Sequence, residues 1–346
     1  MLKINRQIGI ATLLLLLTGQ CIAMSKNDTK FEWLATESAP AHYPMKIIQG
    51  TFIYHGEAEQ GLYIPSGGTL SAGWGQAISG HTAGERLKPL PDRLKIIFFS
   101  YAEKQFYKGE FDLPYEKILA LFRDGTTVNP HVRSDGSTVP AYSRIMVGIA
   151  PGGAVAVWLI APRKTEVFFG QAQKVEIDPG RAFGLPFKSK EQADTYIREV
   201  LEESITPKEL ESLKKNGIPF GLWARYRNRY DWQPTVSKGH SFENVNVSYL
   251  NGEYISNWDL TDKKEMNNPK PVPMKASFHS AMNDKKLIFE MEFDEQEAMA
   301  AFEKLGANGK KVYLEFEPRL PKIQTKVRLY NDKESIELKK FISIRK

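Results

Sequence analysis

Cysteine is almost absent from this chain: Cys21 is the single cysteine in 346 residues. A lone thiol cannot form an intrachain disulfide, so the fold must depend on a buried apolar core, which a chain of this length can supply. Charge of one sign is also scarce, because 47 Lys and Arg residues face 41 Asp and Glu residues. The formal net charge of +6 is too small and too evenly interspersed to indicate a nucleic-acid partner.

The usual catalytic and metal-binding motifs are missing as well. No two of the six histidines stand four residues apart, and there is no HExxH motif, so nothing indicates a zinc hydrolase. The chain has no Gly-x-Ser-x-Gly elbow and no P-loop. Gly73-Trp74-Gly75 lacks the spacing of a dinucleotide fingerprint. We therefore expect no metal and no cofactor.

Two further groups of potentially reactive side chains also give no indication of catalysis. Ser79 and His81 are almost adjacent, and residues so close in sequence rarely orient as a nucleophile and its base. Glu199, Glu202 and Glu203 lie on the polar side of an amphipathic helix pattern, which indicates a solvated face. No residue is predicted to be catalytic, and the protein is not expected to be an enzyme.

The N-terminus has the layout of a secretory signal peptide. Lys3 and Arg6 precede an apolar stretch, Ile8–Leu17, which is followed by small residues up to Ala23. The apolar stretch is about ten residues long, against roughly twenty needed to cross a bilayer. We expect residues 1–23 to be a signal peptide and the protein to act in the periplasm.

Cys21 stands at the end of this signal, and two processing routes remain open. A lipoprotein signal would make Cys21 the lipidated first residue of a membrane-anchored protein facing the periplasm, although Gln20 replaces the usual small residue. Alternatively, signal peptidase reads Cys21 and Ala23 as its small pair and cuts before Met24, which gives a soluble periplasmic protein.

The rest of the chain has the composition of a globular protein, with 42% apolar and 25% charged residues. Alternating and continuous apolar runs predict strands, and Leu113-Pro114 begins a helix. The Pro151-Gly152-Gly153 run predicts a turn between two strands. The strands expected in this first part are Met45–Tyr54, Leu94–Tyr101, Phe106–Phe111, Ile145–Ala150, Ala154–Ile160 and Val167–Ile177.

Two helices and a hairpin follow. Ser189 with Gln192 predicts a capping box for the first helix, and Thr206-Pro207 with Glu209 begins a second in the same way, which ends at Asn216-Gly217. Asn251-Gly252 is a two-residue turn signature between Phe242–Leu250 and Tyr254–Asp259. The segment from Asn267 to Pro273 is interpreted as a polar, proline-rich connection that is not buried.

The end of the chain resembles its beginning. Pro44-Met45-Lys46 and Pro273-Met274-Lys275 each open a strand, and Glu110-Phe111-Asp112 and Glu292-Phe293-Asp294 each close one before a helix. Either the chain contains a degenerate duplication or common short patterns coincide. The later expected strands are Val312–Phe316, Thr325–Tyr330 and Ser335–Ile344.

These patterns predict an α+β fold with two lobes rich in antiparallel sheet. A helical pair is expected to join the lobes. The expected division is an N-terminal lobe at 31–185, a connector at 186–235 and a C-terminal lobe at 236–346.

The segment Trp223–Trp232 is the strongest candidate for partner binding. As a strand it would place three arginines on one face and three aromatic residues on the other. Arginine and large aromatic residues are enriched at interface hot spots. The alternative is an amphipathic strand with its aromatics in the core and its arginines in water; in either case, replacing the arginines is expected to leave the fold intact. The candidate residues are Arg225, Arg227, Arg229, Tyr226, Tyr230 and Trp232.

Several strings between residues 31 and 235 are specific enough to compare with a known family. The most specific is Val147–Gly153 with Trp158, and the shorter ones are Trp33, Ala39-Pro40, His42-Tyr43-Pro44, Leu94–Tyr101 with Glu103 and Tyr107, Leu113-Pro114, and Arg227-x-Arg229-Tyr230-x-Trp232. On these residues the chain resembles the bacterial lipoproteins of domain-of-unknown-function family 2931 (DUF2931). No catalytic residues are assigned to that family.

Some DUF2931 members resemble immunity proteins encoded beside type VI secretion toxins, especially lipase effectors. The resemblance therefore implies an exported, non-catalytic protein that binds and neutralises a periplasmic toxin. An inhibitor needs a stable scaffold and a complementary surface but no reactive group, which agrees with the missing motifs. The alternatives are a lipoprotein that binds envelope glycans or lipids, with Trp74 and Trp223–Trp232 as stacking platforms, and a periplasmic hydrolase.

Overall fold

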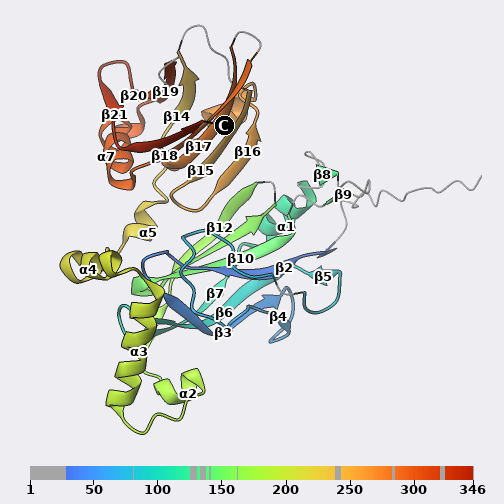
Figure 1. Cartoon of the computed structure of the whole chain (residues 1–346). Helices are drawn as coiled ribbons and strands as arrows, with labels where there is room; N and C mark the ends of the chain where they lie inside the picture. The colour runs from blue at the N-terminus through green and yellow to red at the C-terminus, as the bar shows by residue number, and fades with distance from the viewer. Residues whose placement is uncertain are drawn as a thin grey trace, which may run out of the picture.

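The computed structural model describes residues 29–80, 82–124, 131–132, 138–139, 142–161, 163–237, 243–282, 285–319 and 324–345. The expected signal peptide and Cys21 lie outside these residues. The fold is mixed α+β, as the sequence predicts. It consists of two sheet-rich lobes, and the chain that connects them forms helices (Figure 1). We refer to residues 30–175 as lobe 1 and to residues 230–345 as lobe 2.

Lobe 1 is built from two layers of strands around one apolar core. Helix α1 (Tyr115–Asp124) adds Ile118 and Phe122 to this core. The first layer is a five-stranded sheet in the order β13 (Gln173–Val175), β7 (Gln105–Asp112), β6 (Pro91–Ser100), β3 (Met45–Tyr54) and β4 (Gly61–Tyr63). The second layer is β2 (Leu34–Ser38), β10 (Arg144–Ala150), β11 (Ala154–Ile160) and β12 (Lys164–Gln171).

Lobe 2 has the same construction, with helix α7 (Glu295–Leu305) in the place of α1. Asp294 caps α7 by accepting a hydrogen bond from the Glu297 N–H at 2.9 Å. Its first layer is β22 (Phe341–Arg345), β18 (Lys285–Phe293), β17 (Pro273–Met282), β15 (Glu243–Tyr249) and β16 (Tyr254–Trp258). Its second layer is β14 (Trp232–Val236), β19 (Val312–Arg319), β20 (Gln324–Tyr330) and β21 (Ser335–Leu338).

The strand orders of the two lobes correspond one to one. β13-β7-β6-β3-β4 matches β22-β18-β17-β15-β16, and β2-β10-β11-β12 matches β14-β19-β20-β21. Both second layers begin with a parallel pair, β2 with β10 and β14 with β19. The chain therefore contains two copies of one unit, in agreement with the duplication that the sequence suggested.

The correspondence extends to buried side chains at the start of each copy. Trp33 Nε1 donates to the Pro89 carbonyl at 3.1 Å, and Trp232 Nε1 donates to the Pro271 carbonyl at 3.0 Å. Both indole rings are fully buried. The strings that form these contacts are Phe31-Glu32-Trp33 with Lys88-Pro89-Leu90-Pro91, and Tyr230-Asp231-Trp232 with Lys270-Pro271-Val272-Pro273.

One of the two string matches that suggested the repeat was wrong. Pro44-Met45-Lys46 leads into β3, whereas Pro273 opens β17, and β17 corresponds to β6 rather than to β3. The counterpart of Pro273 is therefore Pro91. The other match is correct, because the two Glu-Phe-Asp strings lie at the ends of the equivalent strands β7 and β18.

The segment before Pro273 is buried, contrary to its interpretation as an exposed connection. Lys270, Val272 and Pro273 are buried. The Lys270 ammonium donates to the carbonyls of Met266 at 2.8 Å and Asn268 at 2.7 Å, so its burial is offset by hydrogen bonds. Burial lowers the pKa of Lys270 to about 8.

Helices link the lobes and cover the outer side of the five-stranded sheet. Ile197 of α3 packs with Phe99 and Phe106. Ser189 caps α3, but the Gln192 side chain accepts from the Lys188 N–H rather than from Ser189. The helices are α2 (Pro179–Phe183), α3 (Lys190–Ser204), α4 (Pro207–Asn216, with the expected capping box) and α5 (Leu222–Arg225).

The remaining elements are short. They are β1 (Lys30–Phe31) paired with β5 (Lys88–Pro89), β8 (His131–Val132) paired with β9 (Thr138–Val139), α6 (Lys263–Asn267), and 3-10 turns at Pro151–Gly153 and Ala307–Gly309. β14 begins at Trp232 and pairs with β19, so the first strand of lobe 2 lies inside the segment expected to be a connector.

Candidate functional site

The segment Trp223–Trp232 does not form the expected strand. Residues Leu222–Arg225 form α5, a turn follows, and β14 begins only at Trp232. Trp223 and Tyr226 stand three residues apart, so the helical turn brings both to one side, where they join the core that extends into lobe 2. The alternation of arginine and aromatic residues has the two-residue period of a strand, which is why the sequence suggested one.

The aromatic residues of this segment are core residues rather than contact residues. Trp223, Tyr226 and Trp232 are 2%, 8% and 1% exposed. Tyr230 is half-buried and packs against Phe302 of α7, with ring centroids 5.7 Å apart. The interpretation with the aromatics in the core is therefore correct for the side chains, although the backbone is not a strand.

Each of the three arginines already has a carboxylate partner. Arg225 pairs with exposed Glu303 at 2.9 Å. Arg227 binds Glu166 of β12, and Arg229 pairs with Glu253 at 2.6 Å. Because Glu166 and Glu253 are almost fully enclosed, Arg227 and Arg229 balance buried charge, and we expect their replacement to cost more stability than that of Arg225.

These ion pairs lie where the two lobes meet. Glu166 comes from lobe 1, whereas Glu253 comes from the turn between β15 and β16 of lobe 2. The Glu166 N–H donates to Glu253 Oε1 at 3.1 Å. Burial raises the pKa of Glu166 to about 7, even though Arg227 favours its ionised form.

Two glycines bring the lobes into backbone contact beside these ion pairs. A Cβ atom on Gly75 would lie 2.5 Å from the Cα atom of Gly252, and both residues have positive φ. Trp158 Nε1 donates to the Asn251 carbonyl at 3.1 Å across the same boundary. The Lys164 ammonium donates to the Gly75 carbonyl, and burial lowers the pKa of Lys164 to about 8.

A different surface is formed by the Pro151-Gly152-Gly153 turn. Glu103 fixes this turn by accepting from the Tyr107 hydroxyl at 2.7 Å and from the Gly152 N–H at 3.0 Å. The Phe220 ring stands against Gly152 and is 63% exposed. A shallow pocket beside the ring is lined by Pro151, Gly152, Ala154, Phe169, Gln171, Phe220, Gly221, Trp223 and Ala224.

Residues 20–221 match the family described as "Protein of unknown function (DUF2931)". The match covers more than half of the chain. The chain belongs to the DUF2931 family. No curated protein and no solved structure matches it.

The DUF2931 region contains lobe 1 and the helices α2 to α4, and it ends one residue after Phe220. The Val147–Gly153 string, Glu103 and Tyr107, on which the resemblance was based, all lie within it. Of these residues, Pro151 and Gly152 line the pocket beside Phe220, and Glu103 holds their turn. The Arg227–Trp232 string and the whole of lobe 2 lie beyond the matched residues.

Trp74, proposed as a stacking platform, is half-buried among other tryptophans in this DUF2931 protein. Its ring centroid lies 5.0 Å from that of Trp158 and 6.4 Å from that of Trp223. Since Trp223 and Trp232 are buried, neither presents a face to a ligand in this conformation.

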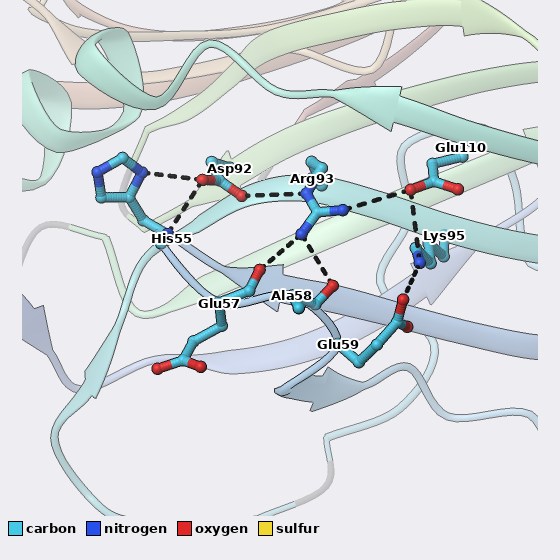
Figure 2. Close-up of polar contacts among 9 residues, drawn as sticks. His55, Glu57, Ala58, Glu59, Asp92, Arg93, Lys95 and Glu110 are labelled. Carbon is cyan, nitrogen blue, oxygen red and sulfur yellow. Dashed lines mark hydrogen bonds and ion pairs between the residues drawn. The ribbon is translucent and has the colours of Figure 1, made fainter.

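A polar network around His55 closes the β3–β4 loop (Figure 2). His55 Nδ1 lies 2.9 Å from Asp92 Oδ2, and the imidazole stacks on Tyr115 with centroids 3.7 Å apart. Arg93 donates to the carbonyls of Glu57 and Ala58 at 2.6 and 2.9 Å. Lys95 pairs with Glu59 and Glu110 in the same network. These contacts tie the loop to β6 and β7, which is a structural role.

The remaining candidate side chains from the sequence, Ser79 and the glutamates of α3, have surroundings that a structural role explains. Ser79 Oγ donates to buried Glu37 at 2.8 Å, and His81 lies outside the described residues. Glu199, Glu202 and Glu203 are exposed on α3, as expected for a solvated face.

Within the described part of the chain, no group of three or more His, Cys, Asp or Glu side chains is arranged to hold a metal ion. No helix there is both long and apolar enough to cross a membrane.

Proposed function

We propose that this DUF2931 protein is an exported, non-catalytic binding protein that neutralises a protein toxin in the periplasm, as an immunity protein for a type VI secretion effector does. Export rests on the signal-peptide pattern of residues 1–23, and lipid attachment at Cys21 would anchor the protein to the membrane. The toxin class, lipase-type, rests on the family resemblance.

The observation that carries the binding proposal is the surface around Phe220. Phe220 is 63% exposed beside the pocket, and phenylalanine is among the residues enriched in the cores of protein interfaces. The Phe220 ring packs against the Pro151–Gly153 turn, which Glu103 holds through the Gly152 N–H. Because this support is already ordered, little conformational entropy would be lost on binding. Arg227 lies 4.8 Å from the Phe169 ring centroid and adds a half-exposed guanidinium beside the pocket.

This surface replaces the one expected at Arg225–Trp232. Of that segment, the exposed Arg225 and the half-exposed Arg227 remain available to a partner, whereas Tyr226 and Trp232 are enclosed. Binding of envelope glycans through stacked tryptophans is less favoured, because Trp223 and Trp232 are enclosed as well.

Calorimetric titration against the toxin encoded beside this gene tests the proposal. We expect Phe220→Ala to weaken binding by about 2 kcal/mol, or roughly thirtyfold, with an unchanged melting temperature. Ile342→Ala is the matched control, since Ile342 is 62% exposed on β22 of lobe 2 and should leave affinity unchanged.

The outcomes separate the parts of the proposal. Absence of binding by the wild-type chain would contradict the immunity function. Wild-type binding that survives Phe220→Ala would place the contact on another surface. Binding to envelope glycans or lipid vesicles instead of the toxin would favour the alternative function.

A further inference from the structure

The two lobes share a sheet, but their strand connection is very narrow. β12 and β16 pair at one position among the described residues, Lys164 with Tyr254, whereas β11 and β12 pair along their whole length. Beside this pair, Gly75 and Gly252 touch through their backbones. The Arg163–Glu265 ion pair and the apolar cluster that joins Ala150 and Ala154 to Trp223 and lobe 2 also hold the lobes together. Because the strand pairing is so short, the relative position of the lobes depends mainly on these and the neighbouring side-chain contacts.

Two carboxylates from opposite lobes occupy the same enclosed space there. The Glu166 side chain of lobe 1 is 5% exposed, and the Glu253 side chain of lobe 2 is 11% exposed. The hydrogen bond from the Glu166 N–H to Glu253 Oε1 places them side by side. Their countercharges, Arg227 and Arg229, both belong to the segment that connects the lobes.

The ionised form of Glu166 is poorly compensated. Arg227 reaches Oε1, but Oε2 is buried with no hydrogen-bond partner among the described residues. Lys117 of α1 donates to the Glu166 carbonyl at 3.3 Å rather than to its carboxylate. Burial is the main cause that raises the pKa of Glu166 to about 7; Arg227 and Arg229 oppose the rise, and the charge of Glu253 adds to it.

We propose that this boundary is a proton-responsive joint, which is closed when Glu166 carries a proton and loosens when Glu166 and Glu253 are both ionised. Ionisation places two like charges from opposite lobes in one enclosed space, and separating the lobes lets water reach both. The proposal concerns the chain alone and requires no partner.

The direction of the pH dependence follows from linkage. In the closed form the pKa of Glu166 is raised to about 7, whereas exposure to water returns it toward its ordinary value of 4.5. The closed form therefore binds the proton more tightly, and closure is lost as pH rises through 7. Between pH 5.5 and 7.5 we expect the ratio of open to closed chains to rise about twentyfold.

Lys164 is the other group at this boundary that titrates near neutrality. Burial lowers its pKa to about 8, so its deprotonation would have the opposite effect on closure. Stopping the titration at pH 7.5 keeps Lys164 mainly charged and isolates Glu166.

Energy transfer between dyes on the two lobes measures the joint. Cysteines replace exposed Gln60 in lobe 1 and exposed Lys333 in lobe 2, in the full chain carrying Cys21→Ser. We expect the ratio of low-transfer to high-transfer chains to grow about twentyfold from pH 5.5 to 7.5. Glu166→Gln, which keeps an oxygen acceptor for Arg227 but cannot ionise, should stay closed at every pH.

Glu303→Gln is the matched control, because it removes the exposed partner of Arg225 and should leave the pH dependence unchanged. A wild-type distribution that does not change with pH would overturn the proposal, and this measurement needs no charge variant to fold. Equal pH dependence in the wild type and in Glu166→Gln would overturn it as well.

Discussion

The two lobes have the same strand order but very different outer faces. In lobe 1, Phe99 of β6 and Phe106 of β7 point outward and are covered by Ile197 of α3. The equivalent face of lobe 2 carries Ser277 and His279 on β17, and no helix of the connection covers it. Helical cover therefore accompanies apolar residues on the outer face and is not a property of the fold.

The inner sides of the lobes are much more alike. Trp33 and Trp232 donate to equivalent proline carbonyls, and each ring centroid lies 6.4 Å from that of a tyrosine on an equivalent strand of the facing layer, Tyr54 of β3 or Tyr249 of β15. A core contact constrains both the shape and the hydrogen bonding of its residues, whereas an outer face needs only to match what lies beside it. The two copies have therefore stayed similar where they are buried.

The largest expected effect tests whether the buried Trp33 and Trp232 sites are also energetic equivalents. We expect Trp33→Ala and Trp232→Ala each to lower the free energy of unfolding by about 4 kcal/mol, because each removes a buried indole and leaves a cavity. Urea unfolding followed by circular dichroism measures both. If the two losses in the free energy of unfolding differ by more than about 2 kcal/mol, the two copies share their strand order but not the energetics of this core site.

Local sequence signals predicted the regular elements well. The Pro151-Gly152-Gly153 turn, the hairpin around Asn251-Gly252 and the Thr206 capping box are all present, because turn and cap chemistry acts over a few residues. Signals that depend on distant partners failed. Lys270 looked solvated, yet carbonyls brought to it by the fold satisfy its ammonium.

The candidate site was harder to predict for the same reason. The arginines of the 225–229 segment were singled out for partner binding, but the carboxylates that Arg227 and Arg229 bind, Glu166 and Glu253, lie 61 and 24 residues away from them. Phe220 gave no signal, since its exposure depends on how α5 packs against the turn at Gly152. The sequence did contain one indication of the buried ion pairs: Lys164 and Glu166 place two charges on one face of a strand that continues with Val167, Phe168 and Phe169.

The next largest effect should appear on the outer faces. Ile197→Ala removes buried apolar area from the α3 contact and should cost about 3 kcal/mol in the free energy of unfolding. His279→Ala, on the uncovered face of lobe 2, should change it by less than about 0.5 kcal/mol. Hydrogen exchange of α3 should increase in the first variant alone. Similar costs for the two variants would contradict the contrast drawn between the faces.

The smallest expected effect compares two neighbouring arginines on either side of the same turn. Arg227→Ala leaves Glu166 without its partner, and since the guanidinium is 43% exposed we expect a moderate loss of about 1–2 kcal/mol in the free energy of unfolding at pH 7.5. Arg225→Ala breaks only an exposed pair with Glu303 and should cost less than about 0.5 kcal/mol. At pH 5.5, where Glu166 is mainly protonated, the cost of Arg227→Ala should shrink toward that of Arg225→Ala. Equal costs at both pH values would mean that Arg227 acts through its packing on Phe169 rather than through the charge of Glu166.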